Sequence, residues 1–270
     1  METQSLRPAG MDASDREEND VDNLYRFRSG SSVIYVVVEP HCVLIQDVAD
    51  YGFPPAIRRL LPPTIPPSHN LVNISRCGAI ATSCKRFADV KVETLWHPLL
   101  IDVSALQVVR ALKPRVFKVK YGSHFAIAKI ARFEFEIPYI QTETEIYRLI
   151  DGEEIGPKFL AHLTENGRTM GFLIEYLDSH CATTADFSKC TAVLVRLHSL
   201  QLVHGDINRN NFLIVGDEAK LIDFDSCVKG SEEMRAAEFD RLHSALMEDS
   251  YRGAPWLGQD LQEDEYTNGI

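Results

Sequence analysis

The segment LVHGDINRNNFLIV, residues 202–215, places polar side chains between two apolar runs. Its histidine, aspartate and asparagines adjoin stretches that are hydrophobic enough to be buried. A polar group that is buried without a hydrogen-bond partner is costly, so these side chains must satisfy one another or contact a ligand. One interpretation is an ordinary turn rich in Asn and Asp. The other is a loop that handles a charged substrate, and the surrounding sequence distinguishes between the two.

Composition limits the classes of protein that the chain can represent. With 270 residues, 45% of them hydrophobic, it can bury a substantial core as one large domain or two lobes. The net charge of -11 argues against a mainly electrostatic grip on nucleic acid, so we expect no nucleic-acid partner, although a local basic pocket is compatible with this balance. The six cysteines form no CxxC pair, which favours free thiols in a reducing compartment.

Export signals and membrane spans are not predicted. The first 20 residues are polar and acidic and lack the apolar core of a signal peptide. The longest apolar run, VIYVVV at residues 33–38, is too short to cross a bilayer. We therefore expect a soluble protein of the cytoplasm or the nucleus, without a membrane partner.

The N-terminal part of the chain carries weak structural signals. Residues 1–30 are charged and poor in hydrophobic residues, which predicts a disordered acidic tail. Residues 31–48 are rich in β-branched residues and predict two strands joined by a turn. Two Pro-Pro pairs within residues 60–70 favour an extended connector, and the apolar spacing of residues 103–112 predicts a helix.

From Arg115 onward the pattern becomes regular. Apolar residues alternate with others on both sides of a turn at 121–123, which predicts a β-hairpin over residues 115–133. The elements predicted after it are a helix over 141–152 that ends at Gly152, a buried strand over 171–178, an amphipathic helix over 186–201 with Asp186 as its N-cap, and a strand over 219–226.

This order resembles the protein kinase-like phosphotransferases: a strand with a lysine, a helix with a glutamate, a buried strand, a helix, a polar loop and a strand that ends in an acid. The resemblance covers roughly residues 109–245. It implies an α+β, two-lobed kinase-like fold with ATP and Mg²⁺ in the cleft. The N-lobe would span residues 109–175 and a shortened C-lobe residues 176–270, with residues 31–108 as a β-rich extension packed on the N-lobe.

The polar loop matches the HxDxxxxN catalytic loop of these enzymes. The resemblance implies that the Asp206 carboxylate orients the attacking hydroxyl and that Asn211 ligates Mg²⁺, while His204 supports the loop. Asp223 in LIDFD matches the metal-binding aspartate of the family, and a carboxylate at the end of an apolar strand needs a cation partner. Asp225 stands where many kinases have glycine. An acidic residue at this position is familiar in aminoglycoside and choline kinase-like enzymes.

Phosphate and adenine contacts are implied by two further matches. Lys129, at the end of AIAK, matches the strand lysine that holds the α- and β-phosphates. Its carboxylate partner on the next helix would be Glu143, with Glu145 as the alternative. The segment IEYL, residues 174–177, matches the hinge, where the backbone of Glu175, Tyr176 and Leu177 would contact the adenine.

The sequence also departs from the family. The three positions of the glycine-rich loop hold Val109, Ala111 and Pro114, so the backbone there cannot approach phosphates as closely as glycine allows. Lys113 is a candidate electrostatic substitute. The catalytic loop reads HGD rather than HRD, and only 45 residues follow Asp225. These features resemble the RIO-type and aminoglycoside phosphotransferase-like branches, and the stretch DYGFPPAIRRLLPP is similar to fungal kinase-like proteins.

Two functions follow from these patterns. The first is an ATP- and Mg²⁺-dependent phosphotransferase whose acceptor is a hydroxyl of a small molecule or a protein. The second is a pseudokinase scaffold that binds a partner without phosphotransfer, which the missing glycines and the extension favour. Glycoside hydrolysis needs a particular pair of carboxylates, and no spacing in the sequence singles one out.

Overall fold

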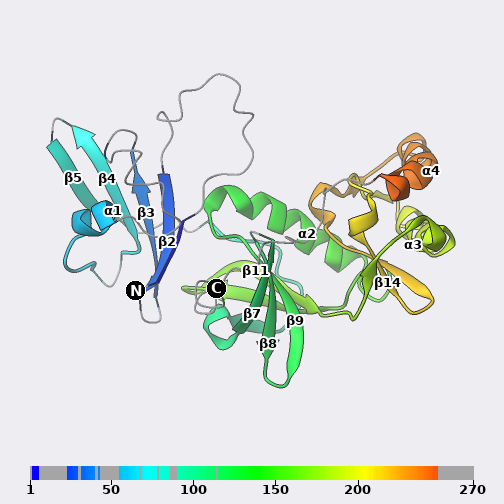
Figure 1. The fold of residues 1–270 in the computed structure, drawn as a ribbon, viewed down its shortest axis with the longest axis horizontal. Coiled ribbons are helices and arrows are strands. Elements are labelled where there is room, and N and C mark those ends of the chain that lie inside the picture. Colours follow the sequence, from blue (N-terminus) through cyan, green and yellow to red (C-terminus); the bar gives the residue numbers. More distant parts are fainter. Residues whose placement is uncertain are drawn as a thin grey trace. The chain divides into compact units, whose positions relative to one another are not determined.

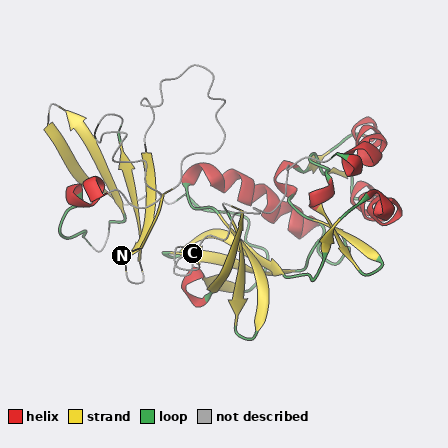
Figure 2. Cartoon of the chain, viewed as in Figure 1, coloured by secondary structure: helices red, strands yellow, loops and turns green. Residues whose placement is uncertain are grey.

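The structure is a computed structural model that describes residues 2–5, 23–29, 32–39, 42, 55–66, 69–77, 79–85, 90–113 and 115–248. Its chain forms two compact units, one up to Asp89 and one that begins at Val90. Both contain strands and helices (Figures 1 and 2). The predicted α+β class is therefore confirmed, and the larger unit is compatible with the two-lobed arrangement that the kinase resemblance implied.

The smaller unit is built on a sheet that has the order β1-β2-β3-β4-β5 among the described residues. Its strands are β1 (Glu2–Ser5), β2 (Asn23–Ser29), β3 (Ser32–Val38), β4 (Leu71–Cys77) and β5 (Ala79–Lys85). β3 and β4 are parallel, and the other neighbours are antiparallel. Alternate residues of β3 pack with Ile57 of helix α1 (Pro55–Leu60), which makes a small apolar core.

Several predictions concern this unit. The strand expected in the first half of residues 31–48 is confirmed as β3, while residues 43–48 lie outside the described residues. β1 and β2 fall within the segment expected to be a disordered tail, most of which is also outside the described residues. Residues 61–66 are irregular, as the Pro-Pro pairs predicted.

A second sheet forms one half of the larger unit. Its order is β6-β10-β11-β9-β8-β7 among the described residues, and all its neighbours are antiparallel except β6 and β10. The strands are β6 (Leu100–Asp102), β7 (Gln107–Lys113), β8 (Val116–Tyr121), β9 (His124–Ile130), β10 (Phe159–Glu165) and β11 (Arg168–Glu175). β6 joins this sheet, so the unit begins before residue 108, where we expected the extension to end.

The hairpin predicted around residues 121–123 is confirmed as β8 and β9, with Gly122 at a positive φ of 59° in the turn. The helix predicted over residues 103–112 is wrong. A short 3₁₀ turn, η2 (Val103–Ala105), is followed by β7, in which Val108 lies opposite Val119 of β8. A short apolar run fits either periodicity, and here β-branched residues and pairing along the sheet favour the strand.

The larger unit also contains the helices α2, α3 and α4 among its described residues. α2 (Ile137–Leu149) follows the 3₁₀ turn η3 (Glu134–Glu136), and α3 (Phe187–Ser199) follows η4 (Thr184–Asp186). Both confirm predicted helices, although α2 begins four residues earlier than expected, with Pro138 in its first turn. α4 (Glu232–Met247) was not predicted; Ser231 caps it by accepting a hydrogen bond from the Met234 N–H.

Small sheets complete the larger unit among the described residues. The first has the order β12-β14-β15, and the second pairs β13 with β16. Their bounds are β12 (His180–Cys181), β13 (Leu202–Val203), β14 (Phe212–Val215), β15 (Glu218–Leu221) and β16 (Val228–Lys229). The 3₁₀ turns η5 (Arg209–Asn211) and η6 (Phe224–Ser226) precede β14 and follow β15, so the predicted strand over 219–226 is confirmed only in its first half.

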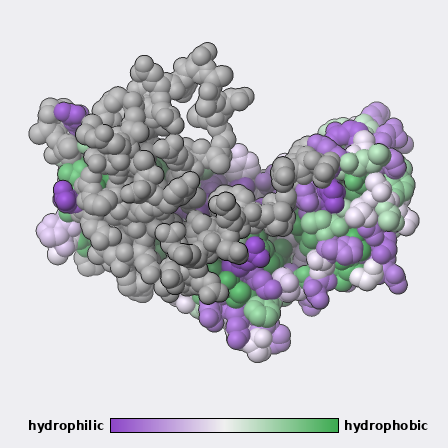
Figure 3. Space-filling model, viewed as in Figure 1, coloured by the Kyte–Doolittle hydropathy of each residue, from purple (hydrophilic) through white to green (hydrophobic). Residues whose placement is uncertain are grey.

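One continuous apolar cluster runs from β11 through α2 to α3, β14, β15 and α4. A second cluster lies within the six-stranded sheet and contains Phe117, Val119 and Leu163. The visible face of the larger unit mixes hydrophilic and hydrophobic residues (Figure 3). The helices within the described residues are all too short or too polar to cross a lipid bilayer.

A buried histidine anchors the segment that leads into β6. The Nε2 atom of His162, on β10, accepts hydrogen bonds from the backbone N–H groups of Trp96 at 3.1 Å and His97 at 3.2 Å. The His162 side chain is fully buried, and burial, with a smaller effect from His97, lowers the pKa of His162 to about 4. A proton on Nε2 would also remove the acceptor, so the folded protein requires the neutral ring.

Acid should therefore destabilise the protein through His162. The unfolded histidine titrates near pH 6.5, so the unfolded state takes up a proton that the folded state binds only near pH 4. Stability is then fully present above pH 6.5 and falls as the pH drops toward 4, by roughly 2 kcal/mol between pH 7 and pH 5. Urea denaturation at both pH values measures the loss.

The matched variant is His162→Gln, whose side-chain oxygen can accept the same N–H groups without titrating. We expect it to lose less stability between pH 7 and pH 5 than the wild type. The variant should retain the part of the acid-induced stability loss that is due to His204, whose pKa is also lowered by burial. An unchanged pH dependence in the variant would contradict this assignment.

Candidate active site

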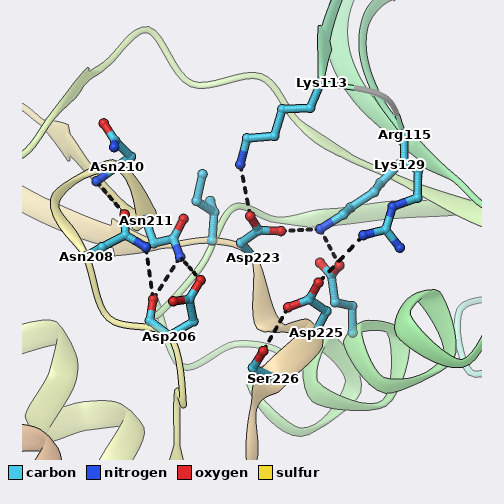
Figure 4. A network of polar contacts seen from close by, with 12 residues as sticks. Lys113, Arg115, Lys129, Asp206, Asn208, Asn210, Asn211, Asp223, Asp225 and Ser226 are labelled. Carbon is cyan, nitrogen blue, oxygen red and sulfur yellow. Dashed lines mark hydrogen bonds and ion pairs between the residues drawn. The ribbon is translucent and has the colours of Figure 1, made fainter. Parts of the chain in front are cut away.

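A cluster of buried charges lies where β9, α2 and the end of β15 meet (Figure 4). The Lys129 ammonium, on β9, forms ion pairs with Glu143 on α2 and with Asp223, which follows β15. Lys113, at the end of β7, places its Nζ 2.9 Å from the other oxygen of Asp223. Lys129 and Glu143 are almost completely buried. Three residues predicted to act together therefore contact one another, and Lys113 joins them.

The local fold explains why Lys129 reaches this position. Gly171 lies opposite Ile130 in the pairing of β9 with β11, and a Cβ atom there would stand 2.3 Å from the backbone oxygen of Lys129. The absence of a side chain at residue 171 therefore lets the two strands approach closely. On the other side, Val116 of β8 lies opposite Lys129.

The pKa values reflect this mutual stabilisation. Burial alone would lower the pKa of Lys129, but Glu143 and Asp223 raise it above its ordinary value. For Asp223 the effect of burial is outweighed by Lys129 and Lys113, which hold its pKa well below the usual range. Burial raises the pKa of Glu143 against the attraction of Lys129. Lys129 and Asp223 are thus charged at neutral pH.

The backbone at Asp223 is unusual. Its φ of 70° and ψ of 59° are left-handed values that residues other than glycine rarely adopt. The turn directs the carboxylate toward the lysines and places the next residue, Phe224, in the core against Tyr147 and His204. A strained conformation at a residue with this environment is typical of functional sites.

The loop that carries Asp206 is held from two sides. The ring of buried His204 forms a hydrogen bond from Nε2 to the Ile222 carbonyl at 3.0 Å, and its Nδ1 accepts from the Asp206 N–H at 3.3 Å. Glu238, on α4, accepts from the N–H groups of His204 at 3.0 Å and Gly205 at 2.8 Å. His204 therefore joins the Asp206 loop to the end of β15 by hydrogen bonds, and its role as a support for the loop stays a prediction.

Glu238 is the residue of this site that sequence reasoning missed. It also pairs with His198 of α3 at 2.8 Å, and it is 5% exposed. Its helix also carries the buried residues Leu242, Ala245 and Leu246, so no local pattern sets this glutamate apart in the sequence. Its partners on the loop lie more than 30 positions away.

Asn211 has a side chain oriented by Asp206. Its Nδ2 donates to the Asp206 backbone oxygen at 2.9 Å and to a carboxylate oxygen of Asp206 at 3.3 Å. The Oδ1 of Asn211 is buried and has no hydrogen-bond partner among the described residues. Buried amide oxygens are nearly always satisfied, so this atom is suited to accept a ligand.

The oxygen atoms here fit a hard divalent cation. Carboxylate oxygens of Glu143, Asp223 and Asp225 lie within 4.8 Å of one another. Mg²⁺ prefers carboxylate and amide oxygens, and Asn211 and Asp223 supply one of each. Asp225 also contacts Ser226 and, at 3.7 Å, Arg115 (Figure 4).

A cavity of about 320 Å³ opens beside the charged cluster. Its lining includes the charged residues Lys113, Lys129, Glu143 and Asp223 and polar residues such as Ser179, His180 and Asn210. Apolar residues also line it, among them Leu112, Val116, Ile127, Ile174, Leu213 and Ile222. Glu175, Tyr176 and Leu177, the residues of the predicted hinge, border the same cavity. A cavity with both apolar and charged walls suits a ligand that has a flat ring and an anionic group.

The structure separates the two glutamates that the sequence left open. Glu143 faces Lys129, whereas Glu145 accepts hydrogen bonds from Gln141 at 2.6 Å and Thr94 at 3.1 Å on another face of α2. The preferred partner, Glu143, is therefore in the predicted position. Asp206 contacts Asn211 through its backbone oxygen and one carboxylate oxygen.

The site combines the catalytic loop, lysine–glutamate pair and strand-end aspartate typical of protein kinase-like phosphotransferases. Residues 173–263 match the model of the Lipopolysaccharide kinase (Kdo/WaaP) family. This region includes Asp206, Asn211 and Asp223, while Lys129 and Glu143 precede it. The family is part of the kinase-like superfamily, so the similarity supports the broader resemblance. The narrower resemblance to RIO-type and fungal proteins stays a prediction.

A curated protein is also similar to part of the chain. The 3-deoxy-D-manno-octulosonic acid kinase of Pasteurella multocida (strain Pm70) is 34% identical over 95 residues, which are 33% of this chain and 40% of that protein. The chain thus aligns with less than half of the relative's length. The match to the family model, residues 173–263, includes the loop of Asp206, whereas Lys129 and Glu143 are placed in the site by geometry alone.

The HGD sequence has a steric cause that a variant can test. Gly205 has a φ of 82°, and a Cβ atom there would stand 2.4 Å from the Ser226 backbone oxygen. We expect Gly205→Ala to reduce the free energy of unfolding by at least about 2 kcal/mol, because left-handed strain adds to the clash. Urea denaturation measures this loss.

Gly216→Ala is the matched control. Gly216 has a φ of 57°, but no atom lies within 4 Å of its added Cβ. It should therefore lose only about 1 kcal/mol, from the backbone conformation alone. Equal losses in the two variants would show that the contact with Ser226 has no role.

Proposed function

We propose that this protein is an ATP- and Mg²⁺-dependent phosphotransferase that moves the γ-phosphate to a hydroxyl group of a sugar. The observation that carries the proposal is the buried Oδ1 of Asn211, which has no hydrogen-bond partner among the described residues. The backbone oxygen of Asn211 accepts from the N–H of Ile222, the residue before Asp223 (Figure 4). A purely structural loop gains nothing from an unsatisfied buried oxygen, whereas a metal ligand requires one.

Each residue has a role in this proposal. Lys129 holds the α- and β-phosphates, and Glu143 keeps its ammonium in place. Asn211 and Asp223 would hold Mg²⁺, which when bound neutralises negative charge on the phosphates. Asp206 accepts a hydrogen bond from the acceptor hydroxyl and orients its oxygen toward the γ-phosphorus. Catalysis then rests on positioning and electrostatic stabilisation.

Two basic residues support phosphate binding without a glycine-rich loop. Lys113 and Arg115 stand on either side of Pro114 in the sequence, and proline has no backbone N–H to donate. The Lys113 ammonium is 2.9 Å from Asp223, and Arg115 lies near Asp225 (Figure 4). We assign to these side chains the contacts that backbone N–H groups make elsewhere in the kinase-like superfamily.

The sugar acceptor is supported by the comparisons. The matching family consists of lipopolysaccharide kinases, and the similar Pasteurella protein is named as a kinase of a sugar acid. A protein acceptor is the competing outcome of the acceptor screen described below. ATP and the acceptor are the partners in this proposal, and we keep the expectation that nucleic acid is not one.

The proposed function can be tested first by nucleotide and metal binding. Saturating ATP with Mg²⁺ should raise the Tm of the wild type by roughly 5 °C or more, because a ligand that binds only the folded state stabilises it. Asp223→Ala, which leaves Lys129 paired with Glu143, should lose the Mg²⁺-dependent part of the rise. Thermal shift with ATP alone, Mg²⁺ alone and both together measures this.

A failure of this test has a defined meaning. If ATP with Mg²⁺ leaves the Tm of the wild type unchanged, the pseudokinase scaffold replaces the enzyme as the better account. The missing nucleotide affinity would then be explained by the residues that replace the three glycines of the family's loop, namely Val109, Ala111 and Pro114.

A variant of Asp206 separates nucleotide binding from phosphate transfer. Asp206→Asn keeps the backbone oxygen that Asn211 contacts, so the thermal shift with ATP and Mg²⁺ should persist. Loss of the carboxylate should reduce turnover about 10²- to 10⁴-fold. ADP release in the presence of a panel of sugars, sugar acids and protein substrates measures turnover and identifies the acceptor class. Wild-type turnover in the variant would remove Asp206 from the mechanism.

A further inference from the structure

The segment that opens the larger unit, residues 90–97, runs between the six-stranded sheet and helix α2, and we name it the strap. Hydrogen bonds join it to strands β10 and β11 of the sheet. The Val92 N–H donates to the Thr169 carbonyl at 2.8 Å, and the N–H groups of Trp96 and His97 donate to His162. Val92 itself is fully buried in the cluster that contains the apolar face of α2. The strap is therefore a fixed part of this unit.

The other side of the strap holds α2 through Gln141. The Oε1 of Gln141 accepts from the backbone N–H groups of Glu93 at 2.7 Å and Thr94 at 3.3 Å. Its Nε2 donates to the Thr94 hydroxyl and to Glu145, both at 2.6 Å. The Thr94 hydroxyl in turn donates to Glu145 at 3.1 Å. Both polar atoms of the Gln141 amide are thus used to join the helix to the strap.

This junction lies two residues from the glutamate that orients Lys129. Residues 141 and 143 point to different faces of a helix, so Gln141 faces the strap while Glu143 faces the lysine. A rotation or shift of α2 would move both contacts together. The Lys129–Glu143 ion pair requires a fixed distance between α2 and β9. The strap contributes to this because it is hydrogen-bonded to the sheet on one side and to α2 on the other.

We propose that Gln141 is a positioning residue that, through the strap, fixes α2 so that Glu143 holds Lys129 ready for the nucleotide phosphates. The role of Lys129 rests on the proposed function, whereas the fixing of α2 does not. Gln141 touches neither nucleotide nor acceptor in this arrangement. Its effect on phosphate binding passes through Glu143.

The test uses the full chain and the variant Gln141→Ala. Alanine favours a helix more than glutamine does, so a loss cannot come from helix propensity. We expect the Kd for fluorescent mant-ATP with Mg²⁺ to rise about three- to tenfold. Thr94→Val, which alters the strap side of the same junction, should change the Kd in the same direction but less. Thr142→Ala is the control, because the partner of the Thr142 hydroxyl among the described residues is the Pro138 carbonyl of its own helix.

A double-mutant cycle distinguishes positioning from general loosening. In a Glu143→Gln background, Gln141→Ala should produce no further rise in the Kd, because its effect requires the Glu143 carboxylate. If Gln141→Ala raises the Kd by the same factor in both backgrounds, or leaves it unchanged in the wild type, the proposal is overturned.

Hydrogen exchange keeps the strap testable if the nucleotide does not bind. The backbone amides of α2 should exchange faster in Gln141→Ala than in Thr142→Ala, with or without nucleotide. A wild type that fails to bind mant-ATP would refute the proposed function, and exchange alone would then decide whether the strap holds α2. Equal exchange in the two variants would refute the strap.

Discussion

The pairing of one buried lysine with two carboxylates organises the larger unit. A lysine that is only 6% exposed is costly unless its charge is met, and Lys129 meets it with residues from two distant parts of the chain. Because Glu143 belongs to α2 and Asp223 follows β15, the ion pairs require the sheet, the helix and the small β12-β14-β15 sheet to stand together. Removal of Lys129 would leave the buried Glu143 carboxylate without its cation, so the site and the arrangement of these elements depend on the same residue.

The half of the site that carries Asp206 is held in a different way. Its loop is positioned by Glu238, by the ring of His204 and by the close approach of Gly205 to Ser226. Most of these contacts involve backbone atoms. The Asp206 side is therefore fixed by the path of the chain, while the Lys129 side is fixed by charged side chains and by the packing of α2. The region that matches the lipopolysaccharide kinase family model, residues 173–263, contains the Asp206 side of the site.

Much of this site could be predicted from the sequence because its motifs are local. Asp206 and Asn211 lie in one short loop, and Lys129 and Glu143 lie on consecutive elements whose periodicity is clear. The choice between Glu143 and Glu145 depends on the rotation of α2, which is set by the packing of its apolar face and by the hydrogen bonds of Gln141 to Glu93 and Thr94. Glu238 could not be predicted, since its partners lie on a loop far away in the sequence. The sequence of β7 predicts a helix because a short apolar run fits both periods, and pairing with β8 selects the strand.

The double contact of Asp223 with Lys113 and Lys129 has a consequence for the order in which ligands arrive. In the protein alone, each oxygen of this carboxylate already has an ammonium partner. A divalent ion by itself would have to compete with two positive charges for the same oxygens. Phosphates offer the lysines an alternative partner and thereby free the carboxylate. On the proposed function, metal and nucleotide are thus expected to enter together, and the protein alone to bind Mg²⁺ weakly.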